Sequence, residues 1–414
     1  GLILAGHDIS AGGLITTLLE MCFANTEGGM EINLDKMKDH DIVKVLFAEN
    51  PGIVIQVADK NKAEVKKILE DAGVGYIKLG TPSEERHILV TKDDATYQFG
   101  IDYLREVWYS TSYLLDRKQS INGCAKKRFE NYEKQPIEFA FNPSFTGKLS
   151  QFGLNPDRRT PSGIKAAIIR EKGTNGEREM AYMLYLAGFD VKDVTMTDLV
   201  SGRETLEDIN MVVYCGGFSN SDVLGSAKGW AGSFLFNPKA KAALDNFYAR
   251  EDTLSLGVCN GCQLMMELGL ITPEDKKKGK MLHNDSHKFE SAFLGVTVPT
   301  NRSVMFGSLS GSKLGIWVAH GEGKFSLPYP EDHYNVVLKY SYDEYPGNPN
   351  GSDYSVAGIA SQDGRHLAMM PHLERACFPW ENAYYPLDRV HEDQITPWME
   401  AFVNARKWVE AHKK

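Results

Sequence analysis

The sequence has no long apolar run. Hydrophobic residues occupy 42% of its 414 positions, yet they never form the stretch of about 18 residues that crosses a lipid bilayer. We therefore expect no membrane-spanning segment and no membrane partner. The chain opens on Gly1-Leu2-Ile3-Leu4, with neither an initiator methionine nor the charged-then-apolar pattern of a signal peptide. This beginning suggests a piece cut from a longer protein.

Clustered positive charge and regularly spaced cysteines are also lacking. The formal net charge is −9, and no stripe of Lys and Arg offers the electrostatic footprint that a nucleic-acid backbone requires. Six cysteines without regular spacing do not make a disulfide framework, and they fit a reducing compartment. We expect no nucleic-acid partner and a cytoplasmic location.

A chain of this length can hold two domains, and apolar periodicity predicts a smaller α/β domain over residues 1–115. Its expected helices span 14–24, 62–72 and 106–115, and its expected strands span 52–57, 76–79 and 87–90. Periodicity then fades over residues 116–162, where prolines such as Pro136 and Pro156 punctuate the sequence. We predict a linker there.

Residues 163–414 are predicted to form a second domain with a parallel-rich sheet, because a strand, a crossover helix and another strand close into a parallel pair. Its expected strands span 165–169, 189–194, 211–215, 254–258 and 314–318, its expected helices span 177–187 and 238–250, and a hairpin is expected over 354–370.

The run 254–268 predicts a buried strand that turns sharply into an amphipathic helix, with Cys259 at the turn. Gly257 and Gly261 lie two residues before and after it, and small residues there leave room for a tight backbone path. The helix dipole and free backbone N–H groups at a helix start favour the thiolate, so the pattern predicts a nucleophile. Other interpretations remain open. Cys259 and Cys262 could form a redox pair or half of a zinc site, and Cys259 could be a buried structural cysteine.

A cysteine nucleophile needs a base within hydrogen-bond reach and a third group that orients the base. His372 and Glu374 have this chemistry, because side chains two residues apart on an extended backbone point the same way. His320 is the rival base. His283 and His287, at helical spacing, are a weaker candidate for a metal site, since no third ligand accompanies them.

Two glycine pairs follow or precede predicted elements. Gly216-Gly217 ends the strand 211–215, and its N–H groups together with those at 259–260 could receive an oxyanion. Gly12-Gly13 precedes the first helix, where free N–H groups suit a phosphate, and Asp8 could hold a Mg²⁺ bridging phosphate oxygens. Each pair could also be a plain turn.

Four motifs follow one another in the second domain, and a fifth lies in the first. They are Gly216-Gly217-Phe218-Ser219, Gly257-Val258-Cys259-Asn260-Gly261-Cys262-Gln263, Ala319-His320-Gly321-Glu322-Gly323, Met370-Pro371-His372-Leu373-Glu374-Arg375, and Gly6-His7-Asp8-Ile9-Ser10 with Gly12-Gly13-Leu14. In this order they resemble the phosphoribosylformylglycinamidine synthase family, from the last nucleotide-binding subdomain of its synthetase part through its glutaminase domain. The resemblance covers nearly the whole chain.

The resemblance implies a flavodoxin-like class I glutamine amidotransferase domain, preceded by a smaller α/β subdomain of an ATP-dependent synthetase. It implies that Cys259 is the nucleophile, that His372 is its base with Glu374 as orienting partner, and that the N–H groups of Gly217 and Asn260 form the oxyanion hole. The further residues that it places at ligands are Gly216, Gln263 and His320 at the substrate, Ser10 at a nucleotide and Asp8 at a metal ion.

The implied reaction belongs to purine biosynthesis. Glutamine is hydrolysed through a cysteine thioester, and ammonia passes to a synthetase site where ATP activates formylglycinamide ribonucleotide, bound mainly outside this chain. Mg²⁺ and ATP or ADP would serve the synthetase, whereas the glutaminase step needs no cofactor. A flavodoxin-like cysteine hydrolase of another substrate and a degenerate module that only binds glutamine or nucleotide remain alternatives.

The sequence departs from the family's usual residues at six positions. The family usually has Asp at 11, Pro at 215, Tyr-Gly at 220 and 221, Arg at 292 and Pro at 373. The residues found here are Ala11, Cys215, Asn220, Ser221, Ala292 and Leu373. None of them belongs to the predicted triad, and the affected regions are the loop around Gly217 and the nucleotide contacts near Ser10.

Overall fold

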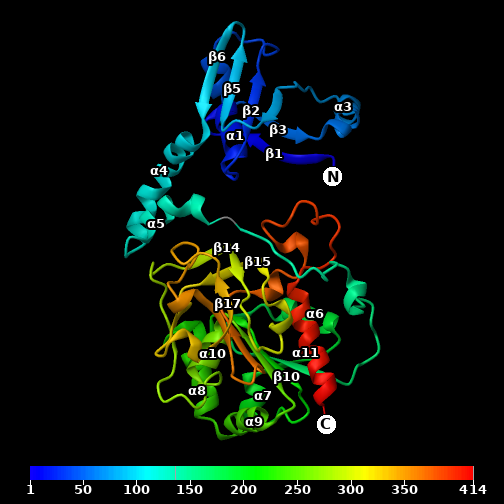
Figure 1. The fold of residues 1–414 in the computed structure, drawn as a ribbon, viewed down its shortest axis with the longest axis vertical. Coiled ribbons are helices and arrows are strands. Elements are labelled where there is room, and N and C mark those ends of the chain that lie inside the picture. The colour runs from blue at the N-terminus through cyan, green and yellow to red at the C-terminus, as the bar shows by residue number, and fades with distance from the viewer. Residues whose placement is uncertain (136, 414) are drawn as a thin grey trace. The chain divides into compact units, whose positions relative to one another are not determined.

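A computed structural model describes residues 1–135 and 137–413. The chain divides into two compact units, Gly1–Lys118 and Gln119–Lys414 (Figure 1). Pro136, one of the prolines expected to punctuate a linker, lies outside the described residues.

The first unit contains a four-stranded sheet and a separate two-stranded sheet. The larger sheet has the order β4-β2-β5-β6 with β2 and β5 parallel, and β1 pairs with β3 in the smaller one. The strands are β1 (Ile3–Ile9), β2 (Gly29–Asn33), β3 (Gly52–Val57), β4 (Gly80–Ser83), β5 (His87–Lys92) and β6 (Ala95–Gly100), and the helices are α1 (Gly13–Phe23), α2 (Ile42–Phe47), α3 (Lys62–Asp71) and α4 (Ile101–Gln119).

This unit has its own hydrophobic core, in which Leu14 and Leu18 of α1 pack with Ile88 and Val90 of β5. The α/β prediction is confirmed here, but the strand expected at 76–79 is wrong.

The chain pairs with β2 slightly later, at β4. A Cβ on Gly80 would overlap the carbonyl oxygen of Glu31, so the close approach of the two strands requires glycine at the start of β4. The apolar residues Tyr76 and Ile77, which suggested the earlier strand, remain exposed.

The second unit is built on a mixed nine-stranded sheet with the order β15-β14-β17-β18-β19-β12-β10-β7-β9. The five strands from β19 to β9 run parallel to one another, and the other four form an antiparallel extension that begins with β18 beside β19. The strands are β7 (Lys165–Arg170), β9 (Asp190–Thr195), β10 (Met211–Tyr214), β12 (Leu254–Val258), β14 (Glu290–Thr297), β15 (Lys313–His320), β17 (Asn335–Tyr340), β18 (Val356–Ala360) and β19 (His366–Met369). The predicted parallel-rich sheet and hairpin are confirmed.

Helices pack on this sheet in two groups. α6 packs against β7, β9 and α11, and α10 packs against β10, β12 and α8; Figure 1 draws the groups on opposite sides of β10. The helices are α6 (Glu177–Ala187), α7 (Met196–Ser201), α8 (Lys228–Leu235), α9 (Pro238–Ala249), α10 (Asn260–Glu267) and α11 (Trp398–His412). Local signals explain two of the ends: Gly188 closes α6 in a left-handed conformation, and the Asn237 side chain caps α9.

Residues 116–162 contain more structure than their sequence indicated. α4 continues to Gln119, and α5 spans Cys124–Asn131. The N–H of Ile121 donates to the carbonyl oxygen of Ser286, and Ala140 forms a bridge with β15. These contacts bind much of the segment to the second unit.

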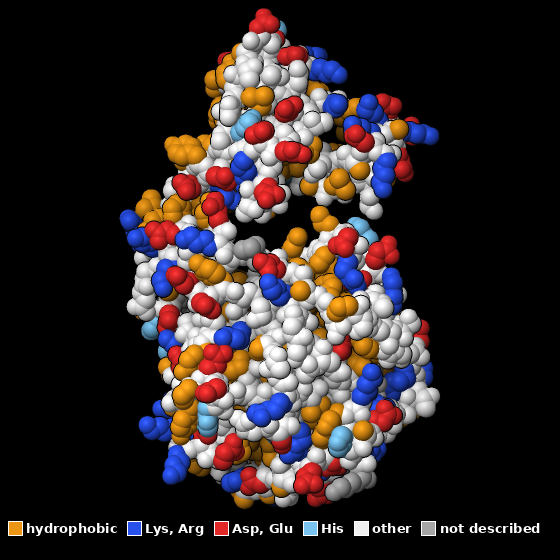
Figure 2. Space-filling model, in the orientation of Figure 1, with side chains coloured by type: hydrophobic (Ala, Val, Ile, Leu, Met, Phe, Trp, Pro, Cys, Tyr) orange, Lys and Arg blue, Asp and Glu red, His pale blue; other side chains and the backbone are white. Residues whose placement is uncertain are grey.

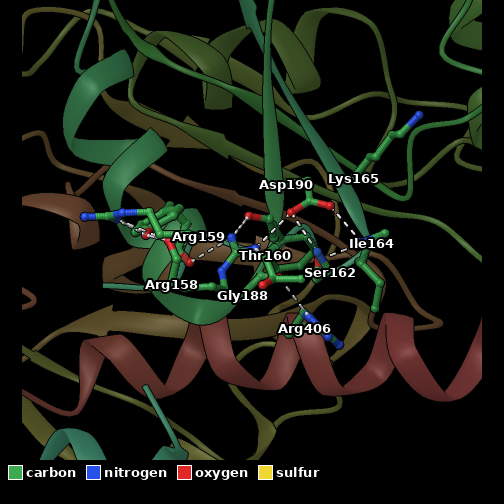
Figure 3. A network of polar contacts seen from close by, with 12 residues as sticks. Arg158, Arg159, Thr160, Ser162, Ile164, Lys165, Gly188, Asp190 and Arg406 are labelled. Atoms are coloured by element: carbon green, nitrogen blue, oxygen red, sulfur yellow. Dashed lines mark hydrogen bonds and ion pairs between the residues drawn. The ribbon is translucent and has the colours of Figure 1, made fainter. Parts of the chain in front are cut away.

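The end of that segment is fastened to β9 by a network around Asp190 (Figure 3). The Asp190 carboxylate accepts hydrogen bonds from the backbone N–H groups of Ser162 and Gly163, at 3.0 and 2.7 Å, and from the Arg158 guanidinium at 2.9 Å. Burial raises the pKa of Asp190, but these hydrogen bonds and the charge of Arg158 outweigh burial and lower the pKa below its usual value.

Charged side chains of both signs are interspersed on the face of the molecule shown in Figure 2, and neither sign forms a continuous field there.

All six cysteines are free and buried. Within residues 1–135 and 137–413, no helix combines the length and the apolar composition that crossing a membrane requires.

Candidate active site

Cys259 lies at the turn between β12 and α10, at the carboxyl end of the parallel strands. Its backbone has φ 54° and ψ −109°, a conformation that residues with a side chain rarely adopt. A Cβ on Gly257 would lie 2.5 Å from the carbonyl oxygen of Gly261, and a Cβ on Gly261 would overlap the carbonyl of Tyr214. Backbone packing therefore requires both glycines, and the predicted strand-to-helix elbow is confirmed.

His372 and Glu374 form a buried pair just beyond β19. The Nδ1 atom of His372 lies 2.7 Å from Oε1 of Glu374, and the two residues are only 2% and 1% exposed. The contact was expected because both residues would lie on an extended backbone, and this reason is wrong in part. His372 is extended, but Glu374 lies on a 3-10 turn, Leu373–Arg375. The turn curls the carboxylate back onto the ring.

Gly216 allows the cysteine and the histidine to meet. A Cβ built on Gly216 would lie 2.8 Å from Cε1 of His372 and 3.3 Å from Cβ of Cys259. The space that a side chain would fill at position 216 is thus occupied by both residues. Since Nδ1 of His372 faces Glu374, Nε2 is the nitrogen left for the sulfur.

The electrostatics of this group favour a charged imidazole. Burial lowers the pKa of His372, but the charges of Glu374 and Cys259, together with hydrogen bonds to both, outweigh burial and raise the pKa to about 10. His320, the rival base, has no carboxylate partner among the described residues, and burial lowers its pKa to about 4. Of the two histidines, His372 therefore holds a proton at neutral pH and His320 does not.

Asn260 connects the two loops that were expected to form an oxyanion hole. As the first residue of α10, its backbone N–H has no partner within the helix. Its side-chain Oδ1 accepts a hydrogen bond from the N–H of Ser219 at 3.1 Å, and its Nδ2 donates to Oε1 of Gln263 at 2.9 Å. The first bond holds the loop that carries Gly217 against the start of α10.

Gln263 and His320 both line a cavity of about 240 Å³ beside Cys259. The Gln263 amide is largely committed to structure, because its Nε2 also donates to the carbonyl oxygen of Glu322 at 2.7 Å. The walls of the cavity come from the loops 217–226 and 283–289 and from residues 319–322, which are the end of β15 and the start of the turn after it. The sulfur of Cys259 lies 3.5 Å from the carbonyl oxygen of Ala319 in the last of these.

The cavity wall contains two carboxylates, Asp222 and Glu322, whose role there was not predicted from the sequence. Ser226 connects them: its N–H donates to Glu322 at 3.3 Å and its hydroxyl to Asp222 at 3.4 Å. Burial and the nearby Glu322 charge raise the pKa of Asp222. No local pattern marks Asp222, which lies in an irregular loop.

The departures Asn220 and Ser221 lie in that loop. Both residues and Asp222 have φ between 50° and 56°, the left-handed region that favours glycine. Asn and Asp adopt this region more readily than other residues with a side chain, so the cost, on the order of 1–2 kcal/mol, falls mainly on Ser221. Of the other departures, Cys215 and Leu373 are buried beside the triad segments, Ala11 is exposed, and Ala292 lines a separate cavity of about 720 Å³.

The other interpretations of the cysteine and histidine motifs have little support. Cys262 is fully buried, and burial raises its pKa well above the usual value, which makes it a poor partner for redox exchange. His283 and His287 lie in a loop and not on a helix, with their rings stacked 5.6 Å apart. In the described part of the chain, no three His, Cys, Asp or Glu side chains are grouped as metal ligands.

At the start of α1, the two glycines do not offer free N–H groups. Gly12 donates to the Glu49 carboxylate at 2.9 Å, and Gly13 donates to the carbonyl oxygen of Ser10 at 3.0 Å. The expectation of free N–H groups at these positions is wrong, because a neighbouring loop and a local turn satisfy both.

Asp8 and Ser10 are exposed, the Asp8 side chain by 71%. The Asp8 carboxylate lies 3.4 Å from Nδ1 of the His7 ring. A single exposed carboxylate suits Mg²⁺ when phosphate oxygens and water supply the remaining ligands. The residues present therefore fit a metal ion shared with a nucleotide, not one held by protein alone.

Comparison with known proteins matches both units. Residues 163–409 match the family described as the CobB/CobQ-like glutamine amidotransferase domain, and residues 1–92 match the C-terminal domain of AIR synthase related proteins.

Among curated relatives, the chain is similar to the probable phosphoribosylformylglycinamidine synthase, chloroplastic/mitochondrial, of Arabidopsis thaliana, with 39% identity over 99% of this chain and 30% of the relative. It is also similar to phosphoribosylformylglycinamidine synthase of Homo sapiens, with 39% identity over 98% of this chain and 32% of the relative. The chain thus spans about a third of the length of these relatives. A solved structure, PurLQS from Thermotoga maritima, is 26% identical over 61% of this chain and 99% of its own, with a TM-score of 0.44.

Proposed function

Because the chain belongs to the family of CobB/CobQ-like glutamine amidotransferase domains, we propose that its second unit releases ammonia from glutamine through a thioester on Cys259. The observation that carries this proposal is the buried arrangement of Cys259, His372 and Glu374 at the end of the parallel strands, beside a cavity.

The first half-reaction forms the thioester. The Cys259 thiolate attacks the side-chain amide carbon of glutamine, and the carbonyl π electrons move to oxygen. When the tetrahedral intermediate collapses, the carbon–nitrogen bond breaks and the His372 imidazolium gives its proton to the departing nitrogen, so that ammonia leaves. The neutral imidazole then takes a proton from water, whose oxygen attacks the thioester carbon and forms a second tetrahedral intermediate. Its collapse breaks the carbon–sulfur bond, which releases glutamate and restores the Cys259 thiolate beside the His372 imidazolium.

Two backbone N–H groups are proposed to stabilise the negative oxygen of both intermediates, those of Gly217 and Asn260. The tether from Asn260 to Ser219 supports this role, because it keeps the Gly217 loop beside the start of α10. Fixed donors of this kind typically contribute on the order of 10²–10³ in rate.

Glutamine as substrate also agrees with the charges in the cavity wall. The α-ammonium group of an amino acid needs an anionic partner, and Asp222 and Glu322 both line the cavity. We propose that these carboxylates receive the α-ammonium group, while Gly216 and His320 contact the substrate from the wall around Cys259.

The relatives are named as phosphoribosylformylglycinamidine synthases. For the complete enzyme we propose that ammonia from this site serves the ATP-dependent conversion of formylglycinamide ribonucleotide to its amidine in purine biosynthesis. Residues 1–115 would be the last subdomain of the synthetase part, and residues 116–162 would link it to the glutaminase. In that subdomain Asp8 would ligate Mg²⁺ and Ser10 would contact ATP or ADP. A cytoplasmic location stays a prediction that the six free cysteines support.

The test is glutamine hydrolysis by the 414-residue chain and by its Cys259→Ala variant, followed as glutamate and ammonia released. We expect the substitution to lower the rate by at least about 10³-fold. Cys262→Ala is the matched control, because Cys262 lies one helical turn away and is expected to leave the rate within about twofold.

Covalent capture distinguishes catalysis from binding alone. A diazo ketone that mimics glutamine should attach once to the parent chain and raise its intact mass accordingly. The intact mass of Cys259→Ala should not change. Glutamine binding without an adduct would instead favour a module that has lost catalysis, and hydrolysis that survives Cys259→Ala would overturn the proposed nucleophile.

A further inference from the structure

Asn284 is a fully buried asparagine behind the wall of the active-site cavity. Its Nδ2 donates to the carbonyl oxygen of His320 at 2.7 Å and to that of Lys288 at 2.9 Å, and its Oδ1 accepts from the N–H of Gly323 at 3.0 Å. Its backbone N–H donates to the carbonyl oxygen of Gly321 at 2.9 Å. Both amide hydrogens are therefore used, and so is the side-chain oxygen.

The partners of Asn284 belong to two different walls of the cavity. Lys288 lies on the loop 283–289, whereas His320 ends β15 and Gly321 and Gly323 lie on the turn that follows it. Residues of both segments line the cavity, and the second segment also contacts the nucleophile and Gln263 through its carbonyl groups. Asn284 belongs to the loop 283–289, and its side chain binds this loop to the end of β15 and the turn after it, beside the Lys324–Asp285 ion pair and the pairing of β13 (Lys280–Leu282) with β16 (Lys324–Ser326). The carbonyl and N–H groups that Asn284 joins cannot rearrange without losing buried hydrogen bonds.

We infer that Asn284 is a positioning residue that sets the width of the glutamine cavity by holding these two walls together, and that it governs glutamine binding more than the chemistry on Cys259. This inference rests on the proposed function. The side-chain hydrogen bonds of Asn284 go to backbone groups and not to Cys259 or His372, so its effect passes through the backbone of the two walls.

The chemistry of the site requires an amide at this position. Asn284→Asp keeps the shape and the acceptor for Gly323, but it turns the donor into an acceptor that faces two carbonyl oxygens. Repulsion then separates the loop 283–289 from the turn after β15. Asn284→Ala removes all three side-chain bonds without repulsion and serves as the second variant.

The matched control is Asn335→Asp. Asn335 is also a buried asparagine that joins two segments: its Nδ2 donates to the carbonyl oxygen of Ser361 and its Oδ1 accepts from the N–H of Arg302, both at 3.1 Å. It is the first residue of β17 and pairs with Ala360 at the end of β18, beside the turn into β19 and at the opposite end of β19 from His372. We expect Asn335→Asp to lower the stability of the second unit and to leave the shape of the cavity unchanged.

The experiment measures KM and kcat for glutamine in the four chains, together with the rate at which iodoacetamide alkylates Cys259. We expect Asn284→Asp to raise KM about tenfold or more, with kcat and the alkylation rate within about threefold of the parent. Asn284→Ala should raise KM by a smaller factor. Asn335→Asp should leave KM within about twofold. Equal KM changes in Asn284→Asp and Asn335→Asp, or a loss confined to kcat, would overturn the inference.

Hydrogen exchange separates this inference from the proposed function. Amide exchange in the loop 283–289 and in the turn after β15 should be faster in Asn284→Asp than in the parent and in Asn335→Asp. If the parent neither hydrolyses glutamine nor reacts with the diazo ketone, the proposed function fails, yet exchange still tests the positioning role. Unchanged exchange in both segments would discard that role.

Discussion

At the scale of single residues, the contrast between two buried histidines shows what a neighbouring carboxylate does. His320 and His372 are equally buried, and burial alone pushes an imidazole toward its neutral form. The pKa of His320 accordingly falls to about 4, whereas the charges of Glu374 and Cys259 raise that of His372 to about 10. His372 therefore has a proton ready for the departing ammonia.

Glu374→Gln tests this argument. Glutamine keeps an acceptor for the ring but removes the charge, so the pKa of His372 should fall from about 10. The proton that the parent retains until the pH rises through about 10 would then be lost at lower pH. The basic limb of the kcat profile for glutamine hydrolysis should shift to lower pH, and kcat at pH 8 should fall on the order of 10²-fold.

Glu381→Gln is the matched control for that measurement. Burial raises the pKa of this nearby carboxyl to about 7, but the side chain caps a turn by accepting a hydrogen bond from the N–H of Phe378, whereas the His372 ring bonds Glu374. Its substitution should leave the basic limb in place. A limb that does not move in Glu374→Gln would show that another group keeps His372 protonated.

At the scale of secondary-structure elements, one carboxylate at the start of β9 binds several of the residues before β7. Asp190 joins Ser162, Gly163 and Arg158, which otherwise have no regular secondary structure to hold them. A carboxylate whose pKa is lowered on folding stabilises the folded chain above the unfolded pKa, about 3.9, and loses that contribution as pH falls through the folded value.

Asp190→Asn should lower the free energy of unfolding of the second unit at pH 7 by about 1–3 kcal/mol, because backbone N–H groups and a guanidinium lose a charged acceptor. The difference between parent and variant should shrink as the pH falls below about 4. Denaturant titration at both pH values measures it. Asp193→Asn, on the same strand but in an exposed ion pair with Arg170, should cost less than about 1 kcal/mol. Equal costs would remove the special role of Asp190.

At the scale of the whole molecule, each unit has a hydrophobic core of its own. Leu18 of α1 belongs to the core of the first unit, and Leu199 of α7 belongs to that of the second. Both side chains are buried, so truncating either leaves a cavity that costs about 2–5 kcal/mol. The separate cores predict two unfolding transitions.

Leu18→Ala should shift one calorimetric transition to lower temperature and leave the other in place, and Leu199→Ala should do the reverse. At 25 °C, glutamine hydrolysis by Leu18→Ala should equal that of the parent, because the active site lies within the second unit. A single transition that both substitutions shift would show that the cores unfold together.

The sequence by itself determined the features whose causes are local. The elbow at Cys259 follows from glycines that any strand-to-helix turn of this tightness needs, and α6 and β3 have the predicted bounds because apolar periodicity and flanking glycines act within a few residues. The α/β class followed from the same periodicity. The nearness of His372 to Cys259 was expected from chemistry and resemblance.

Only the tertiary structure decided which distant groups satisfy one another. Glu49 takes the N–H of Gly12, Asn284 joins two walls of the cavity, and Asp222 meets Glu322 through Ser226. Most of these partners lie on loops that are far apart in the sequence, and their hydrogen bonds leave no periodic trace in it. A buried polar group must find some partner, but the folded backbone alone determines which one is within reach.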